Sequence, residues 1–223
     1  MQVTFVQRKQ LVGEIWEFSF TPQQPVEYVP GQYARLTFPY TIDNARGKQH
    51  RTFSFISHPS EDTIRFITRL DVPLSVFKQP LSELKPGDIM HIDEPHGDAI
   101  LPRLETTPVI FVAQGIAIAS YISMLQEIKQ HRLAHPVSLI WARSAEDSKL
   151  AALIPTVSFT KRVELTYPER LTISHITPQD SPDSLLYLSG SQTFVETLGE
   201  SLEASGISRE RIIYDYYSGY AEL

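Results

Sequence analysis

The apolar residues of this chain change their spacing once, near Leu101-Pro102-Arg103. Before this point apolar and polar residues alternate, as in residues 14–20, and strict alternation indicates half-buried β-strands. After it, the apolar residues 108–112 precede a segment with helical spacing, a pattern typical of a buried strand and its covering helix. The 223 residues are enough for two domains of about 100 residues each. We therefore predict two domains of different class, residues 1–102 and residues 103–223.

The first half is predicted to be a small antiparallel β-barrel. Its short alternating segments are separated by turn signals such as Pro30-Gly31 and Pro86-Gly87, a pattern typical of such barrels. We expect six strands, at residues 2–6, 14–20, 33–38, 49–56, 63–70 and 88–92. Residues 43–48 are expected to form a polar hairpin connection, and residues 74–79 a short helix.

The second half is predicted to be an open parallel sheet with helices on both faces, which is a Rossmann-like fold. Strand and helix patterns alternate along it, as they do in such sheets. Strands are expected at residues 108–112, 137–141, 162–167, 185–188 and 211–214. Helices are expected over residues 118–128 and 193–205, and Gly206 is a plausible terminator of the second helix.

Composition excludes several kinds of site. The sequence has no cysteine, so it forms no disulfide, thiolate nucleophile, zinc-thiolate site or cysteine-ligated iron–sulfur cluster. The net charge of −6 and the lack of a basic run argue against nucleic acid and anionic membranes as main partners. His96 is expected to be a surface or packing residue of its loop, and the other six histidines show no metal-ligand spacing, so we predict no metal site. No signal peptide or membrane span is expected, and a cytoplasmic location is the default.

The tetrapeptide Arg51-Thr52-Phe53-Ser54 lies inside a strand-like run and combines three useful side chains. Because successive side chains of a strand alternate, Arg51 and Phe53 share one face while Thr52 and Ser54 share the other. A guanidinium offers forked donors to a pyrophosphate, an aromatic ring stacks, and a hydroxyl bonds a ring nitrogen. This combination suits a flavin dinucleotide, although an edge strand with an exposed arginine has the same pattern.

Further motifs surround this tetrapeptide in a fixed order. In chain order, the motifs are Pro30-Gly31-Gln32-Tyr33, Arg51-Thr52-Phe53-Ser54, Lys85-Pro86-Gly87-Asp88, Pro95-His96-Gly97, Gln114-Gly115-Ile116-Ala117, Ser189-Gly190-Ser191 and Tyr214-Asp215-Tyr216-Tyr217. This order resembles the ferredoxin–NADP reductase family of flavoproteins over nearly the whole chain. The resemblance implies a barrel that binds FAD (FMN is possible) and an α/β domain that binds NAD(P)H.

The resemblance assigns roles to residues of the barrel. It implies that Arg51 pairs with the FAD pyrophosphate, that Phe53 packs against the isoalloxazine or ribityl group, and that Ser54 faces flavin N5. Ser75 opens the expected short helix, whose first amides suit a phosphate, although the serine alternatively only caps that helix. The candidate cofactor-binding residues of the barrel are Arg51, Thr52, Phe53, Ser54, Thr68 and Ser75.

The turn Gln114-Gly115-Ile116-Ala117 departs from the family pattern, which has Gly-Gly-x-Gly there. Those glycines bring bare backbone close to the dinucleotide phosphates. Here only Gly115 remains, and Gln114 and Ala117 add side chains where bare backbone is expected. The turn is expected to bind nicotinamide dinucleotide through Gln114, Gly115 and Ile116. The alternative is a pocket that no longer binds nicotinamide well.

Other candidate residues of the second domain follow its predicted strands. Arg143 and Ser144 are placed to meet the adenosine ribose or a 2′-phosphate, because ligands of such sheets lie beyond the carboxyl ends of strands. Alternatively, this Arg-Ser pair followed by Glu146-Asp147 is only a helix N-terminus with an ion pair.

The last motifs of the chain supply further candidates. By resemblance, Gly190 allows close approach of nicotinamide, and Ser189 replaces a family cysteine near the hydride path. Asp215 is expected to help protonation or orientation near the flavin, and Tyr217 or Tyr220 to cover the ring, unless these aromatic residues are plain core. The candidate catalytic residues are Ser54, Ser189 and Asp215.

The resemblance implies hydride transfer from NAD(P)H to FAD, with electrons passed to a separate small-molecule or protein acceptor. One alternative is an NAD(P)H:flavin reductase that uses flavin as a substrate, which Pro95-His96-Gly97 and the lack of a fused module favour. Another is a non-enzymatic electron-relay or redox-sensing module, which Gln114, Ala117 and Ser189 favour. Neither the acceptor, the preferred nicotinamide nor the oligomeric state follows from the sequence.

Overall fold

The computed structural model of the chain describes residues 1–41 and 49–217. It divides into two compact units, Met1–Ile100 and Leu101–Leu223. The boundary predicted from the sequence, between residues 102 and 103, lies two residues later. The hairpin connection predicted at residues 43–48 and Tyr220 lie outside the described residues. In the described part of the chain, no helix combines the length and the apolar character that crossing a bilayer requires.

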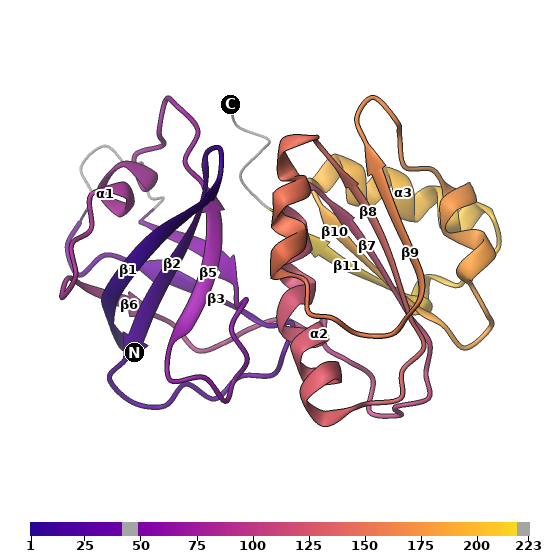
Figure 1. Cartoon of the computed structure of the whole chain (residues 1–223), viewed down its shortest axis with the longest axis horizontal. Helices are drawn as coiled ribbons and strands as arrows, with labels where there is room; N and C mark the ends of the chain where they lie inside the picture. Colours follow the sequence, from indigo (N-terminus) through magenta and orange to yellow (C-terminus); the bar gives the residue numbers. More distant parts are fainter. Residues whose placement is uncertain (42–48, 218–223) are drawn as a thin grey trace. The chain divides into compact units, whose positions relative to one another are not determined.

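The first unit is an antiparallel six-stranded sheet with one short helix (Figure 1), so the predicted β fold is confirmed. The strands follow the order β4-β3-β6-β1-β2-β5. β4 and β5 are the two edge strands of this sheet. The segment that follows β4 is hydrogen-bonded to β5, because the Ile56 N–H donates to the Arg65 carbonyl at 2.8 Å. The elements are β1 (Gln2–Val12), β2 (Ile15–Pro22), β3 (Tyr33–Thr37), β4 (His50–Ser54), β5 (Ile64–Arg69), α1 (Lys78–Ser82) and β6 (Ile89–Ile92).

Phenylalanine rings fill the core of this unit. The alternating strands turn one set of side chains inward, and the Phe5, Phe18, Phe20 and Phe66 rings pack together with centroids 5.2–6.2 Å apart. Each of the four is at most 2% exposed. Tilted and offset aromatic pairs of this kind contribute beyond the area they bury, so this cluster is the rigid base of the unit.

The short helix of the first unit begins later than predicted. The sequence placed it at residues 74–79, but α1 covers Lys78–Ser82. Ser75 therefore precedes the helix instead of lying in its first turn. Its hydroxyl accepts a hydrogen bond from the Lys78 N–H at 3.3 Å, and its carbonyl accepts one from the Gln79 N–H at 3.0 Å. The later start accommodates Pro80 in the first turn, where a proline needs no hydrogen-bond donor.

The second unit is a five-stranded sheet in which every pair of neighbouring strands is parallel, as predicted. The strands follow the order β11-β10-β7-β8-β9. From β7 the chain adds β8 and β9 on one side of the sheet and then crosses to add β10 and β11 on the other side. The direction in which successive strands are added therefore reverses between β7 and β10. The elements are β7 (Val109–Gln114), α2 (Ala119–His131), β8 (Val137–Arg143), β9 (Phe159–Thr166), β10 (Leu185–Gly190), α3 (Gln192–Ala204) and β11 (Ile212–Tyr216).

The two long helices cover opposite faces of this sheet (Figure 1). Ile110 and Val112 of β7 belong to the cluster that includes Val195 of α3. Phe111, between them, stacks on Tyr121 of α2 with ring centroids 4.6 Å apart. Both faces of β7 are thus buried, which explains why its sequence is apolar throughout and not alternating.

Candidate functional site

The strand β4 carries the flavin motif and presents its side chains as the alternation predicts. Arg51 and Phe53 are partly buried, whereas Thr52 between them is exposed. Ser54, the last residue of the strand, lies opposite Tyr33 of β3 and is also partly buried. Arg51 and Ser54 are therefore held on one short rigid strand.

The ring of Phe53 rests on the barrel core. It stacks on Phe66 with centroids 4.5 Å apart and an interplanar angle of 10°. Phe77 lies nearby, with its centroid 6.5 Å from that of Phe53. Phe53 thus belongs to the packed floor of the site, and only its remaining exposed part is open to a ligand. Its contact with a flavin stays a prediction.

The guanidinium of Arg51 lies over the ring of Phe77, with Cζ 5.5 Å from the ring centroid. Its NH1 group donates to the His50 carbonyl at 2.9 Å. Burial lowers the pKa of Arg51 from its usual value, because a charged group loses hydration there. The cation–π contact and the backbone bond fix the direction of this cation.

The two other barrel candidates differ in exposure. Thr68 lies in β5 opposite Trp16 and is 6% exposed, so its side chain is enclosed in the sheet. Ser75 is exposed beside the start of α1. Their roles in cofactor binding remain predictions, and the buried position of Thr68 favours a structural contribution.

In the second unit, the predicted nicotinamide residues converge where the strand order reverses. Gln114 ends β7 and Gly190 ends β10, and these strands are direct neighbours. The crevice outside the carboxyl ends of strands at such a reversal is where open α/β sheets bind ligands. Gly115 adopts φ +56°, a conformation that favours glycine, and its carbonyl accepts a hydrogen bond from Trp141 Nε1 at 2.9 Å.

The side chain of Gln114 bridges the two strand ends. Its Oε1 accepts hydrogen bonds from the Ser191 hydroxyl at 3.1 Å and from the Ser191 N–H at 3.4 Å. A Cβ at Gly190 would lie 3.1 Å from the Gln114 Cβ and 2.7 Å from Phe194 Cδ1. The backbone of Gly190 is therefore bare but closely flanked, and Gln114 occupies the space beside it. Ile116, in the turn that follows, is 6% exposed and packs inside the unit.

A partly buried carboxylate, that of Asp215 in β11, lies on the strand next to β10. Oδ2 of Asp215 accepts hydrogen bonds from Ser120 Oγ at 2.5 Å and from Ser189 Oγ at 2.7 Å. Ser120 Oγ also lies 3.3 Å from the Tyr217 hydroxyl. Ser120 and Ser189 are at most 1% exposed. The three candidates Ser189, Asp215 and Tyr217 are thus brought together, and Ser120 of α2 joins them.

Burial raises the pKa of Asp215 above its usual value, while the hydrogen bonds from Ser120 and Ser189 act in the opposite direction. A folded-state pKa above the unfolded-state value means that the stability from Asp215 is fully present below the unfolded-state pKa. It is lost as the pH rises through the folded-state pKa. Asparagine does not titrate. As the pH rises from the unfolded-state pKa of Asp215 through its folded-state pKa, the free energy of unfolding of wild type should therefore fall relative to that of Asp215→Asn.

This prediction is checked by urea unfolding at several pH values in a Trp16→Phe background. The chain has two tryptophans, so Trp141, which is 0% exposed, then reports the second unit alone. Asp183→Asn, on the loop before β10, is the control for a general change of charge. A difference between wild type and Asp215→Asn that does not vary with pH would contradict the raised pKa.

The arginine predicted to meet the ribose is held by a carboxylate that the sequence did not indicate. Arg143 donates to Glu164 Oε2 through Nε at 3.0 Å and NH2 at 2.7 Å. Arg162 binds the other oxygen of Glu164 at 2.7 Å. Burial raises the pKa of Glu164, but the bonds from both arginines outweigh it and lower the pKa overall. Ser144 Oγ accepts the Asp147 N–H at 3.0 Å, as in the capping alternative.

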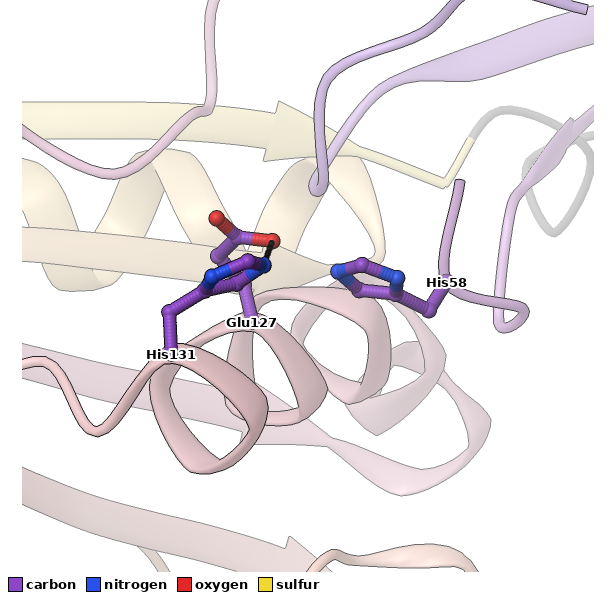
Figure 2. Close-up of side chains that lie close together, drawn as sticks. All are labelled: His58, Glu127 and His131. Carbon is purple, nitrogen blue, oxygen red and sulfur yellow. Dashed lines mark ion pairs between the residues drawn. The ribbon is translucent and has the colours of Figure 1, made fainter. Parts of the chain in front are cut away.

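Figure 2 draws three side chains that carry possible metal-ligand atoms, His58 of the first unit and Glu127 and His131 of α2. In α2, Glu127 Oε2 lies 3.8 Å from His131 Nε2, one helical turn away. In the first unit, His58 Nδ1 lies 2.7 Å from Ser60 Oγ. The α2 pair has the spacing of an ordinary surface ion pair and supplies fewer ligands than a structural zinc site needs. The expected lack of a metal site stays a prediction.

Comparison with known proteins gives the chain's relatives. No family model matches it. Flavohemoprotein A of Dictyostelium discoideum is 22% identical over 226 residues, which are 92% of the chain and 57% of that protein. The toluate 1,2-dioxygenase electron transfer component of Pseudomonas putida is 27% identical over 212 residues, 87% of the chain and 60% of that protein. A solved ferredoxin NADP+ reductase from Neisseria gonorrhoeae, with bound FAD and NADP, matches with a TM-score of 0.77 at 17% identity, covering 97% of this chain and 98% of that one.

The sequence relatives and the structural neighbours agree with the resemblance predicted from the motifs. The chain is similar in sequence to flavohemoproteins and dioxygenase electron transfer components, and it shares the fold of a solved ferredoxin NADP+ reductase. It spans less than two thirds of the length of the first curated relatives, 57% and 60% of the two named above.

Three residues that contact the candidate residues escaped the sequence analysis. Ser120 lies near the start of the predicted helix, where a small polar residue beside an apolar helical pattern was a usable signal. Glu164 and Trp141 contact the predicted residues Arg143 and Gly115 only through tertiary packing. No local spacing marks such contacts, so sequence alone had no means of finding them.

Proposed function

We propose that the protein is an NAD(P)H-dependent FAD oxidoreductase that passes electrons to a separate small-molecule or protein acceptor. The observation that carries the proposal is strand β4, which holds a partly buried, oriented guanidinium at Arg51 and a hydroxyl at Ser54 on one rigid element. Two relatives support it by name. One is an electron transfer component, and the other is a reductase with bound FAD and NADP.

The residues of the first unit fit a flavin nucleotide. Arg51 offers donors beyond its bond to the His50 carbonyl, and its charge is partly desolvated. A phosphate would replace the lost hydration with charge-assisted hydrogen bonds. Ser54, three residues along the same strand, would donate to or accept from a flavin ring nitrogen.

A bound flavin would supply hydride acceptance and stepwise electron transfer, which no amino-acid side chain of this protein provides. The protein's own contribution is placement and electrostatics. Arg51 would hold the phosphate end, and Ser54 would orient the ring edge. In the second unit, Gly190 would leave room for the nicotinamide ring, and Gly115 would present backbone beside it.

The second unit raises a rival function. Gln114 Oε1 already accepts the Ser191 donors at the N-terminus of α3. A ligand oxygen at that place would have to displace this carboxamide or bind beside it. This contact favours a flavin-bound relay or sensing module that does not accept hydride from NAD(P)H. We rank it second, because Gly190 and Gly115 keep the bare backbone that a nicotinamide would need.

Absorbance spectroscopy tests the proposal and separates the two functions. The purified protein, supplied with FAD, is expected to show a bound flavin spectrum, and anaerobic NADH or NADPH is expected to bleach the flavin band. Dithionite is the control for complete reduction. A protein that binds FAD but is bleached only by dithionite would support the relay function, and a protein that binds neither FAD nor FMN would overturn both.

We also place the protein in the cytoplasm, where its proposed electron donors, the reduced nicotinamide dinucleotides, are available. A single protein or small-molecule acceptor is the only other partner in the proposal. The net charge of −6 supports the expectation that nucleic acid is not among its partners.

A further inference from the structure

A buried indole in the second unit connects two of the candidate dinucleotide-binding residues. Trp141 lies in β8, opposite Ala113 of β7, and is 0% exposed. Its Nε1–H donates to the carbonyl of Gly115, the residue that follows β7, at 2.9 Å. The guanidinium of Arg143, the last residue of β8, lies over its ring, with Cζ 5.3 Å from the ring centroid. One side chain therefore contacts residues at the carboxyl ends of two neighbouring parallel strands.

The hydrogen bond from the indole sets the orientation of the backbone at Gly115. Gly115 adopts φ +56°, a region that glycine tolerates but to which it is not confined. A further contact is therefore needed to hold the turn in this conformation, and the bond from Trp141 to the carbonyl supplies it. The next peptide bond is trans and planar, so its N–H, that of Ile116, points away from the indole. Trp141 thus fixes a whole peptide plane at the end of β7.

The ring of the same indole supports the guanidinium of Arg143. Residues two apart in a strand point to the same face of the sheet, which places Arg143 above Trp141. Glu164 accepts hydrogen bonds from Nε and NH2 of this guanidinium at 3.0 and 2.7 Å, and the Ser144 carbonyl accepts one from NH1 at 3.4 Å. Of the five N–H donors of a guanidinium, these bonds use three. The carboxylate fixes the edge of the group, and the indole fixes its face.

The orientation of Gly115 matters because the neighbouring positions of the turn are not bare. Gln114 before it and Ala117 two residues later carry side chains, so a ligand that approaches the backbone of this turn has to do so at Gly115. An error of about 1 Å in the placement of a reactant has an effect of about 100-fold on the rate. A residue that fixes this backbone therefore controls the rate without contacting the ligand itself.

We propose that Trp141 is a positioning residue for the nicotinamide dinucleotide, which holds the backbone at Gly115 for the nicotinamide end and the guanidinium of Arg143 for the adenosine end. The inference rests on the proposed function, because it takes the ligand of the second unit to be NAD(P)H. It goes beyond that function by assigning a role to a side chain that is fully buried and has no access to the ligand.

Anaerobic stopped-flow absorbance on the FAD-loaded protein tests the inference with two hydride donors. One is NADH or NADPH, whichever reduces wild type faster, and the other is reduced nicotinamide mononucleotide, which has no adenosine. The slope of the flavin reduction rate against donor concentration is measured. Trp141→Phe removes the N–H but keeps a ring below Arg143. It should lower the slope about 2- to 10-fold with both donors, the range for one hydrogen bond.

Trp141→Leu separates the second contact from the first. It removes the N–H and also the ring, so the slope for the dinucleotide should fall a further 2- to 5-fold or about that, the range for an exposed cation–π contact. The slope for the mononucleotide should equal that of Trp141→Phe, because this donor has no adenosine end. Trp16→Phe is the matched control in the first unit, where the Arg8 guanidinium lies over the Trp16 ring with Cζ 5.6 Å from the centroid. It should change neither slope.

The outcomes separate the inference from the function on which it rests. Wild-type slopes in Trp141→Phe would overturn the role at Gly115, and equal further losses with both donors in Trp141→Leu would overturn the role at Arg143. Far-UV circular dichroism and full reduction by dithionite report the fold and the bound flavin. A loss of either in both variants would show a purely structural residue and overturn the proposal. A wild-type protein that binds FAD but is reduced by neither donor would instead overturn the proposed function.

Discussion

Replacing Phe66 by alanine is expected to lower the free energy of unfolding of the first unit by about 3–5 kcal/mol. Phe66 is 2% exposed and touches three other rings, stacking on Phe53 and Phe20 with centroids 4.5 and 5.2 Å apart and on Phe18 at 6.2 Å. Alanine would remove the ring and leave a cavity that the neighbouring strands cannot close. The loss extends to the site, because Phe53 and hence β4 rest on this ring.

Urea unfolding in a Trp141→Phe background measures this effect, since Trp16 then reports the first unit alone. Phe66→Leu is the matched control. It keeps most of the volume and should cost less than about 1.5 kcal/mol. FAD affinity should fall in Phe66→Ala even under conditions where the unit remains folded. A cost for alanine no greater than that for leucine would show that the stacked cluster is not the base of the barrel.

The fold could be predicted from the sequence because burial of one or both faces of a strand or helix sets the spacing of its apolar residues. The alternation of residues 14–20 places β2 on a half-buried sheet, and the continuous apolar residues of β7 match a strand covered on both faces. The short helix was misplaced because its limits depend on local contacts. Ser75 precedes α1, and Pro80 lies in the first turn, a combination that residue spacing does not reveal.

The sequence predicted those features of the sites that depend on a single short segment of the chain. The alternation of β4 correctly placed Arg51 and Phe53 on one face. It did not reveal that Phe53 stacks on Phe66, because that partner is 13 residues away on another strand. The partners of Asp215 and Arg143 are equally distant in sequence. Ser120 reaches Asp215 across 95 residues, and Glu164 reaches Arg143 across 21.

Replacing Gly190 by alanine is expected to slow anaerobic reduction of bound flavin by NAD(P)H at least about 100-fold, because an error of about 1 Å in placement has an effect of this size. The new Cβ would lie 2.7 Å from Phe194 Cδ1 and 3.1 Å from the Gln114 Cβ. One of these neighbours must shift, which should also cost about 1–3 kcal/mol of stability. Stopped-flow absorbance measures the rate, and Trp141 fluorescence in the Trp16→Phe background measures the stability.

Gln114→Gly provides the opposing change at the same place. It removes the side chain that flanks Gly190 and frees the Ser191 donors, so it should tighten NAD(P)H binding and speed flavin reduction. The double variant Gly190→Ala/Gln114→Gly should recover part of the lost rate, because the added methyl group then has room on one side. FAD affinity should not change in any of the three, since Arg51 and Ser54 belong to the other unit. If Gly190→Ala reduces flavin as fast as wild type, nicotinamide does not bind at the ends of β7 and β10, and Gln114 has no part in admitting it.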